Sequence, residues 1–124
     1  MATALIVDDS SSMRMILRKT LEEIGFNVRE AGNGKEALSL LATETERISF
    51  GLLDWNMPEM DGFELLQKIR AIPKFNSMVI IMVTAENELE HIAEALEAGA
   101  DEYVMKPFTK DILVGKLELT GIEL

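Results

Sequence analysis

The sequence of 124 residues has no cysteine, so disulfide bonds and thiolate metal sites are excluded. No apolar run approaches the ~18–20 residues that a membrane-spanning helix needs, and no signal-peptide pattern opens the chain. Positive charge is scarce, with 12 lysines and arginines against 22 aspartates and glutamates and a net charge of −10. Because neutralising phosphates needs a basic face, the sequence argues against binding to nucleic acid or to an anionic membrane. We expect a soluble, cytoplasmic protein.

Hydrophobic residues make up 48% of the chain, which is enough for one folded domain of this length. Short apolar runs that favour strands alternate with segments of helical periodicity. Strands are expected at residues 4–7, 26–31, 47–54, 78–83 and 102–105, and helices at 13–24, 37–43, 62–71, 89–96 and 110–117. This alternation predicts an α/β fold, a parallel sheet with helices on both faces, in a single domain over residues 1–124. Met1 stands just before the first strand, which favours a whole protein.

The segment LLDWNMPEMDG at 52–62 is the most informative stretch of the chain. An apolar run ends on the carboxylate of Asp54, and Pro58 prevents the strand from continuing. Asp61 then suits the N-cap of a new helix. Asp54 is therefore expected at the C-terminal tip of a buried strand, the edge at which open α/β sheets bind ligands. An aspartate at a strand end can also simply cap a turn. The residues at the other strand ends are therefore needed to distinguish a turn cap from a functional carboxylate.

Further strand ends are polar as well. The first strand ends in Asp8-Asp9, the fourth in Thr84 and the fifth in Lys106. Since parallel strands place their C-terminal ends on one edge, these side chains and Asp54 are expected in one small cleft. Each has a simple structural explanation on its own, as a loop acid, a strand end or a surface lysine. Their joint occurrence at four strand ends favours a functional site.

The chemistry of such a cleft follows from its charges. Carboxylates a few ångströms apart repel each other unless a cation lies between them, and a set of oxygen ligands favours Mg²⁺. A carboxylate can attack phosphorus to give an aspartyl phosphate. Asp54 would be that nucleophile, with Asp8 and Asp9 seating the metal and with Lys106 and Thr84 holding the phosphoryl oxygens.

The motifs VDDSSSMR at 7–14, LLDWNMPEMDG at 52–62, IMVTAE at 81–86 and AGADEYVMKPFT at 98–109 carry a resemblance to a known family. They resemble the receiver domain of two-component response regulators, and most closely the stand-alone chemotaxis type, the CheY-like proteins. The resemblance spans essentially the whole chain. It implies a flavodoxin-like (βα)5 doubly wound parallel sheet with strand order 2-1-3-4-5, an order taken over from that family, and Mg²⁺ as cofactor.

The family's roles map onto residues of this sequence. The resemblance implies that Asp54 is the phosphoacceptor, with Thr84 and Lys106 beside it. It also implies that Tyr103 is the aromatic switch residue, although a half-exposed strand tyrosine would give the same pattern. The implied Mg²⁺ ligands are Asp9, Asp54 and the main-chain carbonyl of Asn56, with Asp8 helping through water, and the residues implied to tune self-dephosphorylation are Asn56 and Glu86. The Lys106-Pro107 bond is cis in this family.

The function implied by the resemblance is a phosphorylation-activated signalling switch. It would accept phosphate from a CheA-like histidine kinase and catalyse only its own phosphorylation and dephosphorylation. It would act as a monomer on a downstream protein through the fourth helix, fifth strand and fifth helix. A phosphate sink or phosphorelay intermediate is the alternative. The acidic fourth-helix segment, with Glu90, Glu94 and Glu97, favours a basic partner over an acidic one.

Two other functions fit the residues less well. A phosphatase or phosphotransferase with an aspartyl nucleophile resembles this site, but those enzymes use a second acid two positions on, and Asn56 cannot supply a proton. A flavin-binding module on the same fold needs a phosphate cradle after the first strand. Residues 10–12 could serve, but Asp8 and Asp9 would repel a flavin phosphate. The lone histidine, His91, lies in an acidic helix, where a surface position is expected and zinc ligation is not.

Overall fold

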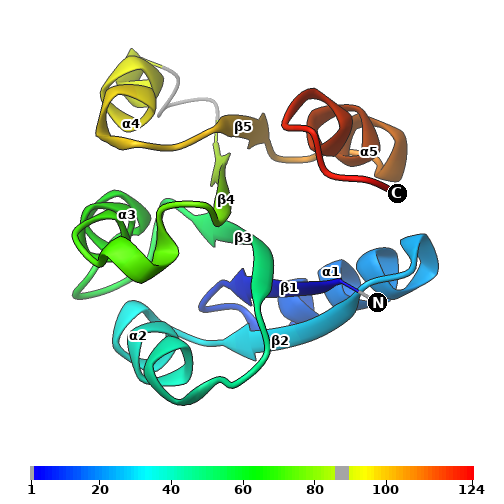
Figure 1. The fold of residues 1–124 in the computed structure, drawn as a ribbon. Coiled ribbons are helices and arrows are strands. Elements are labelled where there is room, and N and C mark those ends of the chain that lie inside the picture. Colours follow the sequence, from blue (N-terminus) through cyan, green and yellow to red (C-terminus); the bar gives the residue numbers. More distant parts are fainter. Residues whose placement is uncertain (1, 86–89) are drawn as a thin grey trace.

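The computed structural model describes residues 2–85 and 90–124. Within these ranges, five parallel strands form one sheet in the order β2-β1-β3-β4-β5 (Figure 1). The elements along the chain are β1 (Thr3–Val7), α1 (Ser11–Ile24), β2 (Asn27–Ala31), α2 (Gly34–Thr43), β3 (Ile48–Asp54), α3 (Gly62–Arg70), a 3-10 turn η1 (Pro73–Phe75), β4 (Val79–Thr84), α4 (Ile92–Ala98), β5 (Glu102–Met105) and α5 (Lys110–Leu119). The predicted fold class and strand order are confirmed.

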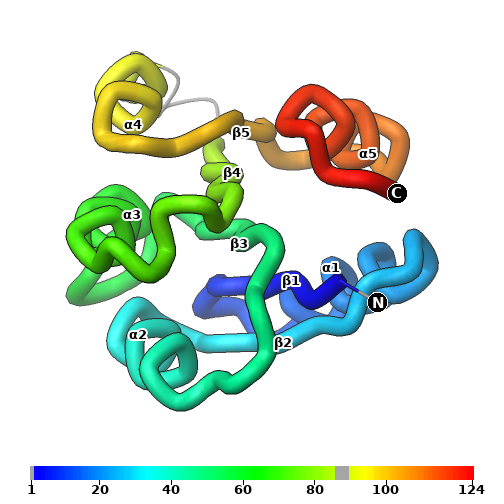
Figure 2. The backbone as a smooth tube through the Cα atoms, viewed as in Figure 1, coloured from blue at the N-terminus to red at the C-terminus, as the bar shows by residue number. Residues whose placement is uncertain are grey.

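Helices cover both faces of the sheet. α2, α3 and α4 lie on one face and α1 and α5 on the other (Figure 1), and the tube in Figure 2 shows the chain changing face after α1 and again before α5. Along β1, alternate side chains enter different clusters, because successive residues of a strand point to opposite faces. Leu5 and Val7 pack with α2 and α3, whereas Ala4 and Ile6 pack with α1 and α5. The sheet is thereby buried between two helical layers.

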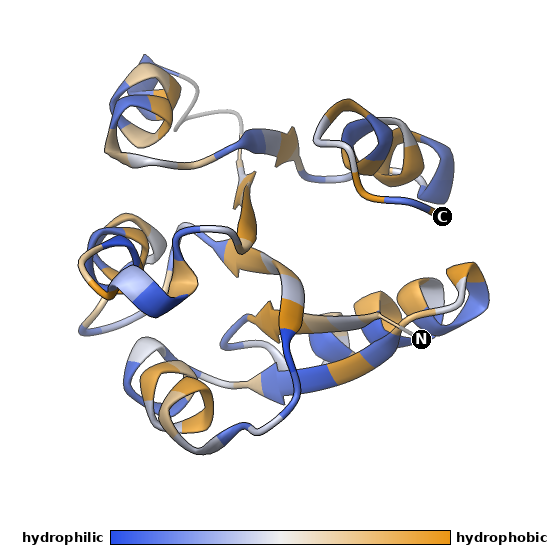
Figure 3. Cartoon of the chain, in the orientation of Figure 1, coloured by the Kyte–Doolittle hydropathy of each residue, from blue (hydrophilic) through white to orange (hydrophobic). Residues whose placement is uncertain are grey.

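The central strands are the most apolar. β1, β3 and β4 are mainly hydrophobic, and the edge strands β2 and β5 carry more hydrophilic residues (Figure 3). Every residue of β1 is buried, as the apolar run predicts for a strand covered on both faces. None of the helices in the described ranges combines the length and the apolar character that crossing a membrane requires.

Helix ends follow from local sequence. The predicted N-caps Asp61 and Thr109 are confirmed, since their side chains accept the backbone N–H groups of Glu64 at 2.8 Å and Ile112 at 3.2 Å. Ser10 and Asn33 cap α1 and α2 in the same way. Gly25 and Gly99 end α1 and α4 in the left-handed conformation, with φ of 118° and 115°.

The element bounds differ from the prediction by one to three residues at several ends, and η1 was not predicted. The predicted helix at 62–71 is closed by Pro73, but the following residues form a short 3-10 turn rather than a plain loop. Asn33 starts α2 at Gly34, three residues earlier than the apolar periodicity indicated, because the cap sets the first turn. The predicted start of the fourth helix at residue 89 lies outside the described residues.

Gly62 lies against the tip of β3. Its N–H donates to the carbonyl of Trp55 at 2.9 Å. A Cβ atom at this position would lie 2.3 Å from the carbonyl oxygen of Asp54 and 2.9 Å from the Cα of Trp55. Since both contacts are with backbone, no side chain can rotate away to make room. The start of α3 can therefore sit beside the end of β3 only with glycine here.

We predict that Gly62→Ala lowers the free energy of unfolding by about 2 kcal/mol, the usual scale for forcing extra volume into a packed site. Gly115→Ala is the matched control, because Gly115 lies within α5 and a Cβ there meets nothing within 4 Å. That control should gain up to about 1 kcal/mol from helix propensity. Urea unfolding of both variants measures the difference, and equal stabilities would contradict the proposed close approach.

Candidate functional site

The C-terminal ends of the strands bring the predicted polar residues to one edge. Asp54 and Thr84 are the last residues of β3 and β4, Asp8 follows β1, and Lys106 follows β5. The Nζ atom of Lys106 lies 3.3 Å from Oδ1 of Asp54 and 3.4 Å from Oδ2 of Asp8. The Asp8 and Asp54 side chains are almost fully buried and that of Lys106 is 28% exposed. One ammonium group thus bridges two buried carboxylates.

A third carboxylate completes the cluster. One oxygen from each of Asp8, Asp9 and Asp54 lies within 4.8 Å of the others, and Asp9 is exposed while its neighbours are buried. The Asp8 carboxylate is further fixed by the N–H of Ser10, which donates to Oδ1 at 2.9 Å. Carboxylate oxygens with an open, solvent-facing side suit a hard divalent cation that keeps part of its water shell. The residues present therefore fit a metal of that class.

The charges of the site act on each other. Burial raises the pKa of Asp54 from 3.8 to about 6; the negative charge of Asp8 adds to the effect, and Lys106 opposes it. Burial lowers the pKa of Lys106, but the carboxylates of Asp54 and then of Asp8 outweigh it, so that pKa is raised overall. Lys106 therefore stays charged, and Asp54 is largely ionised at neutral pH.

Thr84 and Tyr103 lie on the same face of the sheet. Thr84 is buried, and its Oγ1 lies 3.5 Å from the carbonyl oxygen of Val104, which accepts its hydrogen bond. Tyr103 is paired in register with Met82, two residues before Thr84 on β4. Because side chains alternate along a strand, Thr84 and Tyr103 point to the same face of the sheet, the one that α4 covers. The ring of Tyr103 is half-buried, and Nζ of Lys116 lies 4.5 Å from its centroid. The structure thus places Thr84 toward the β5 backbone.

The remaining predicted residues are more dispersed. Asn56 is exposed in the loop between β3 and α3, two residues beyond Asp54. Glu86 lies outside the described residues. The Lys106-Pro107 peptide bond is cis, as the resemblance implied. His91 is exposed, as the sequence predicted, and its ring nitrogens lie near Glu90 and Glu94, at 3.8 and 3.6 Å from their carboxylate oxygens.

Sequence reasoning missed two sets of neighbours. The ring of Trp55 stacks on Phe63 at 5.6 Å between centroids and on His91 at 6.4 Å, which joins the end of β3 to the start of α4. Nη1 of Arg14 donates to the main-chain carbonyl of Asp8 at 2.6 Å. The only sequence signal for that contact is a single arginine five residues beyond the acidic pair, in the first turn of the helix that follows.

In metal-free protein, we predict that Asp54→Asn is stabilising at pH 7–8 by about 3 kcal/mol, since the pKa of Asp54 rises from 3.8 to about 6 on folding. Between pH 4 and 6 the folded state binds more protons than the unfolded state, so the wild type loses stability as pH rises. The gain of the variant should accordingly shrink below pH 6 and vanish near pH 4. Urea unfolding in the presence of a chelator, at several pH values, measures the difference in the free energy of unfolding between variant and wild type. Asp61→Asn is the control, because Asp61 is exposed and asparagine can still act as an N-cap. A gain in the free energy of unfolding that does not depend on pH would contradict the raised pKa of Asp54.

Comparisons with known proteins agree with this geometry. A family model, the response regulator receiver domain, matches residues 4–118. A chemotaxis protein CheY homolog of Campylobacter jejuni is 49% identical over 115 residues, covering 92% of this chain and 88% of that protein. The chemotaxis protein CheY1 of Helicobacter pylori is 43% identical over 116 residues and 93% of each chain.

A solved structure shares the fold. The structure of the chemotaxis protein CheY4 of Vibrio cholerae has a TM-score of 0.87 and 35% sequence identity, and covers 95% of this chain and 97% of its own. The resemblance drawn from the four sequence motifs is confirmed by the family model, by these relatives and by the shared strand order. The chain belongs to the response regulator receiver domain family.

Proposed function

We propose that this chain is a phosphorylation-activated signalling switch that accepts a phosphoryl group on Asp54 from a CheA-like histidine kinase. The observation that carries the proposal is the bridge from Lys106 to the carboxylates of Asp54 and Asp8 beside a third carboxylate. Residues 1–124 form one receiver domain in this proposal, and the setting is the cytoplasm. The chemotaxis proteins named above support a role in a two-component chemotaxis system.

The chemistry assigned to the residues is phosphoryl transfer. A carboxylate oxygen of Asp54 forms the new bond to phosphorus while the bond from phosphorus to the histidine nitrogen of the donor breaks. Lys106 is near enough to Asp54 to balance charge on a transferred phosphoryl oxygen. The chain catalyses only this step and the later hydrolysis of its own acyl phosphate, which Asn56 and Glu86 tune.

The proposed cofactor is Mg²⁺. Asp8, Asp9, Asp54 and the main-chain carbonyl of Asn56 would hold it, with Asp8 acting through water. When bound, the ion neutralises the crowded carboxylates and the incoming phosphoryl oxygens. The support is the set of carboxylate oxygens within 4.8 Å of one another and their access to solvent at Asp9.

The proposed switch begins at Thr84. A phosphoryl group adds close to two negative charges, so the Thr84 hydroxyl leaves the carbonyl of Val104 and donates to the phosphoryl group instead. Tyr103, on the same sheet face, then fills the space that Thr84 vacates. Phosphorylation thereby shifts the balance between two states of the surface made by α4, β5 and α5. The chain acts on its partner as a monomer.

The partner at this surface is a basic protein segment in our proposal. Glu90, Glu94 and Glu97 project from α4 and the helix entrance as exposed acids. Their charges would repel an acidic peptide and attract a basic one.

Acetyl phosphate tests the phosphoacceptor directly. With Mg²⁺ present, the wild type should gain about 80 Da, one phosphoryl group, whereas Asp54→Asn should gain nothing, because an amide is not a nucleophile of this kind. Intact-protein mass spectrometry at neutral pH measures the change. Asp61→Asn, which leaves the cluster intact, is the control and should be labelled like the wild type. Labelling of Asp54→Asn at the wild-type level would refute the assignment.

Fluorescence tests the cation. Trp55 is half-buried and follows Asp54 directly in the chain, and its main-chain N–H donates to the carbonyl of Val83 at 2.9 Å, so an ion bound by the cluster should alter the emission of its ring. We expect a saturable change on titration with Mg²⁺, and weaker binding in Asp9→Asn, which removes one negative charge from the cluster. A flat response up to tens of millimolar would count against the metal assignment.

A further inference from the structure

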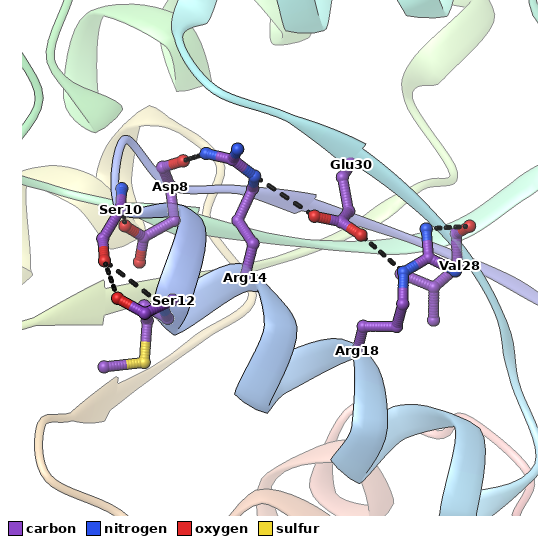
Figure 4. Close-up of polar contacts among 8 residues, drawn as sticks. Asp8, Ser10, Ser12, Arg14, Arg18, Val28 and Glu30 are labelled. Atoms are coloured by element: carbon purple, nitrogen blue, oxygen red, sulfur yellow. Dashed lines mark hydrogen bonds and ion pairs between the residues drawn. The ribbon is translucent and has the colours of Figure 1, made fainter.

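The carbonyl group of Asp8 is held by a side chain from α1. Nη1 of Arg14 donates to it at 2.6 Å, and Nε of the same guanidinium donates to Oε1 of Glu30 at 3.1 Å (Figure 4). Glu30 lies on β2, on the far side of β1 from the β3 tip. One planar group thus joins the start of the acidic loop to a neighbouring strand.

Glu30 is itself held from two sides. Its second oxygen, Oε2, accepts from Nε of Arg18, one turn further along α1, and Arg18 also donates to the carbonyl of Val28 at 3.2 Å (Figure 4). The side chains of Arg14 and Glu30 are 21% and 29% exposed, so solvent competes only in part for these contacts. A Cβ atom on Gly32 would lie 3.3 Å from Nη1 of Arg14, which shows how closely the guanidinium packs under the turn after β2.

Together with these contacts, the main chain and the side chain of Asp8 are both held in place. The N–H of Asp8 donates to Ala31 at 3.2 Å, Oδ1 accepts from Ser10, and Oδ2 lies near Lys106. The Asp8 carbonyl belongs to the peptide unit that leads into Asp9. Arg14 therefore fixes the orientation of the peptide that carries the third, exposed carboxylate of the cluster.

We propose that Arg14 is a positioning residue for the cation site, and that Glu30 and Arg18 hold its guanidinium in place. The proposal rests on the proposed function, because it assumes that the carboxylate cluster binds Mg²⁺. Arg14 acts through geometry: its guanidinium donates to Glu30 and to the Asp8 carbonyl from two nitrogens held in one plane, whereas a lysine has a single nitrogen. Groups that orient metal ligands in this way commonly alter affinity by one to two orders of magnitude.

Arg14→Lys tests geometry at constant charge. The variant should raise the Kd for Mg²⁺ roughly 10-fold, measured by Trp55 fluorescence, while the formal charge near the carboxylates is unchanged. Arg29→Lys is the matched control. Arg29 lies on β2 next to Glu30, and its Nε lies 3.0 Å from Oε2 of Glu44. Among the described residues it has no contact with the acidic loop. Its Kd should equal that of the wild type, with thermal melts confirming that both variants are folded.

Glu30→Gln tests whether Glu30 acts through Arg14. It should weaken Mg²⁺ binding in the wild-type background and have no further effect in Arg14→Lys, because coupled residues are non-additive. A general effect of the lost negative charge would persist in both backgrounds, and that result would overturn the role of Glu30.

A measurement without metal separates this proposal from the proposed function. In metal-free Arg14→Lys, amide hydrogen exchange at Ser10, whose N–H is bound to the Asp8 carboxylate, should be faster than in the wild type. A wild type that fails to bind Mg²⁺ would refute the cation site itself. A wild type that binds, together with an Arg14→Lys variant of equal Kd and unchanged exchange, would overturn the positioning role alone. An equal rise in Kd for Arg29→Lys would overturn it as well.

Discussion

One ammonium group between two buried carboxylates is the interaction on which this structure depends. Lys106 reaches Asp54 and Asp8 at 3.3 and 3.4 Å. Buried charges are costly unless they are paired, and here a single positive charge faces two buried acids and a third acid at the surface. Pairing therefore leaves the site with an excess of negative charge. Burial first, and then the charge of Asp8, keep the pKa of Asp54 raised to about 6 despite its lysine. A site that is incompletely neutralised is ready to take up positive charge.

The fold has to hold these repelling groups together. It does so because each carboxylate is attached to the end of an apolar strand that the core fixes on both faces. β1 and β3 pair along their lengths, with Val7 opposite Leu53, so Asp8 and Asp54 leave the sheet side by side. The close approach of Gly62 then folds α3 back against Asp54. Hydrophobic burial in the sheet thus supports an arrangement of charges that would not form by itself.

Sequence alone predicts the parts of this site that depend on chain direction. An apolar run that ends in Asp54, or in Asp8, predicts a carboxylate at the C-terminal edge, because parallel strands end together. Sequence does not predict contacts that depend on rotamers or on packing between distant elements.

The Thr84 hydroxyl faces the Val104 carbonyl because of its rotamer. Arg14 and Glu30 meet because α1 crosses β2, and neither the periodicity nor the motif contains that crossing angle. The 3-10 turn after Pro73 was missed because a proline predicts where a helix ends and says little about the turn that follows.

The sheet separates two groups of side chains that the proposals above use. Arg14, Glu30 and Arg18 lie on the side of α1, whereas Thr84 and Tyr103 lie on the side of α4, and the sheet stands between them. Among the described residues, the groups that hold the acidic loop therefore lie on the opposite side of the sheet from Thr84 and Tyr103, and α5 packs with α1 on the side of the acidic-loop groups. In the proposed switch, substitutions around Arg14 would therefore reach the cation site without altering the side chains that pack beside Thr84 and Tyr103, so these two parts of the site would vary independently.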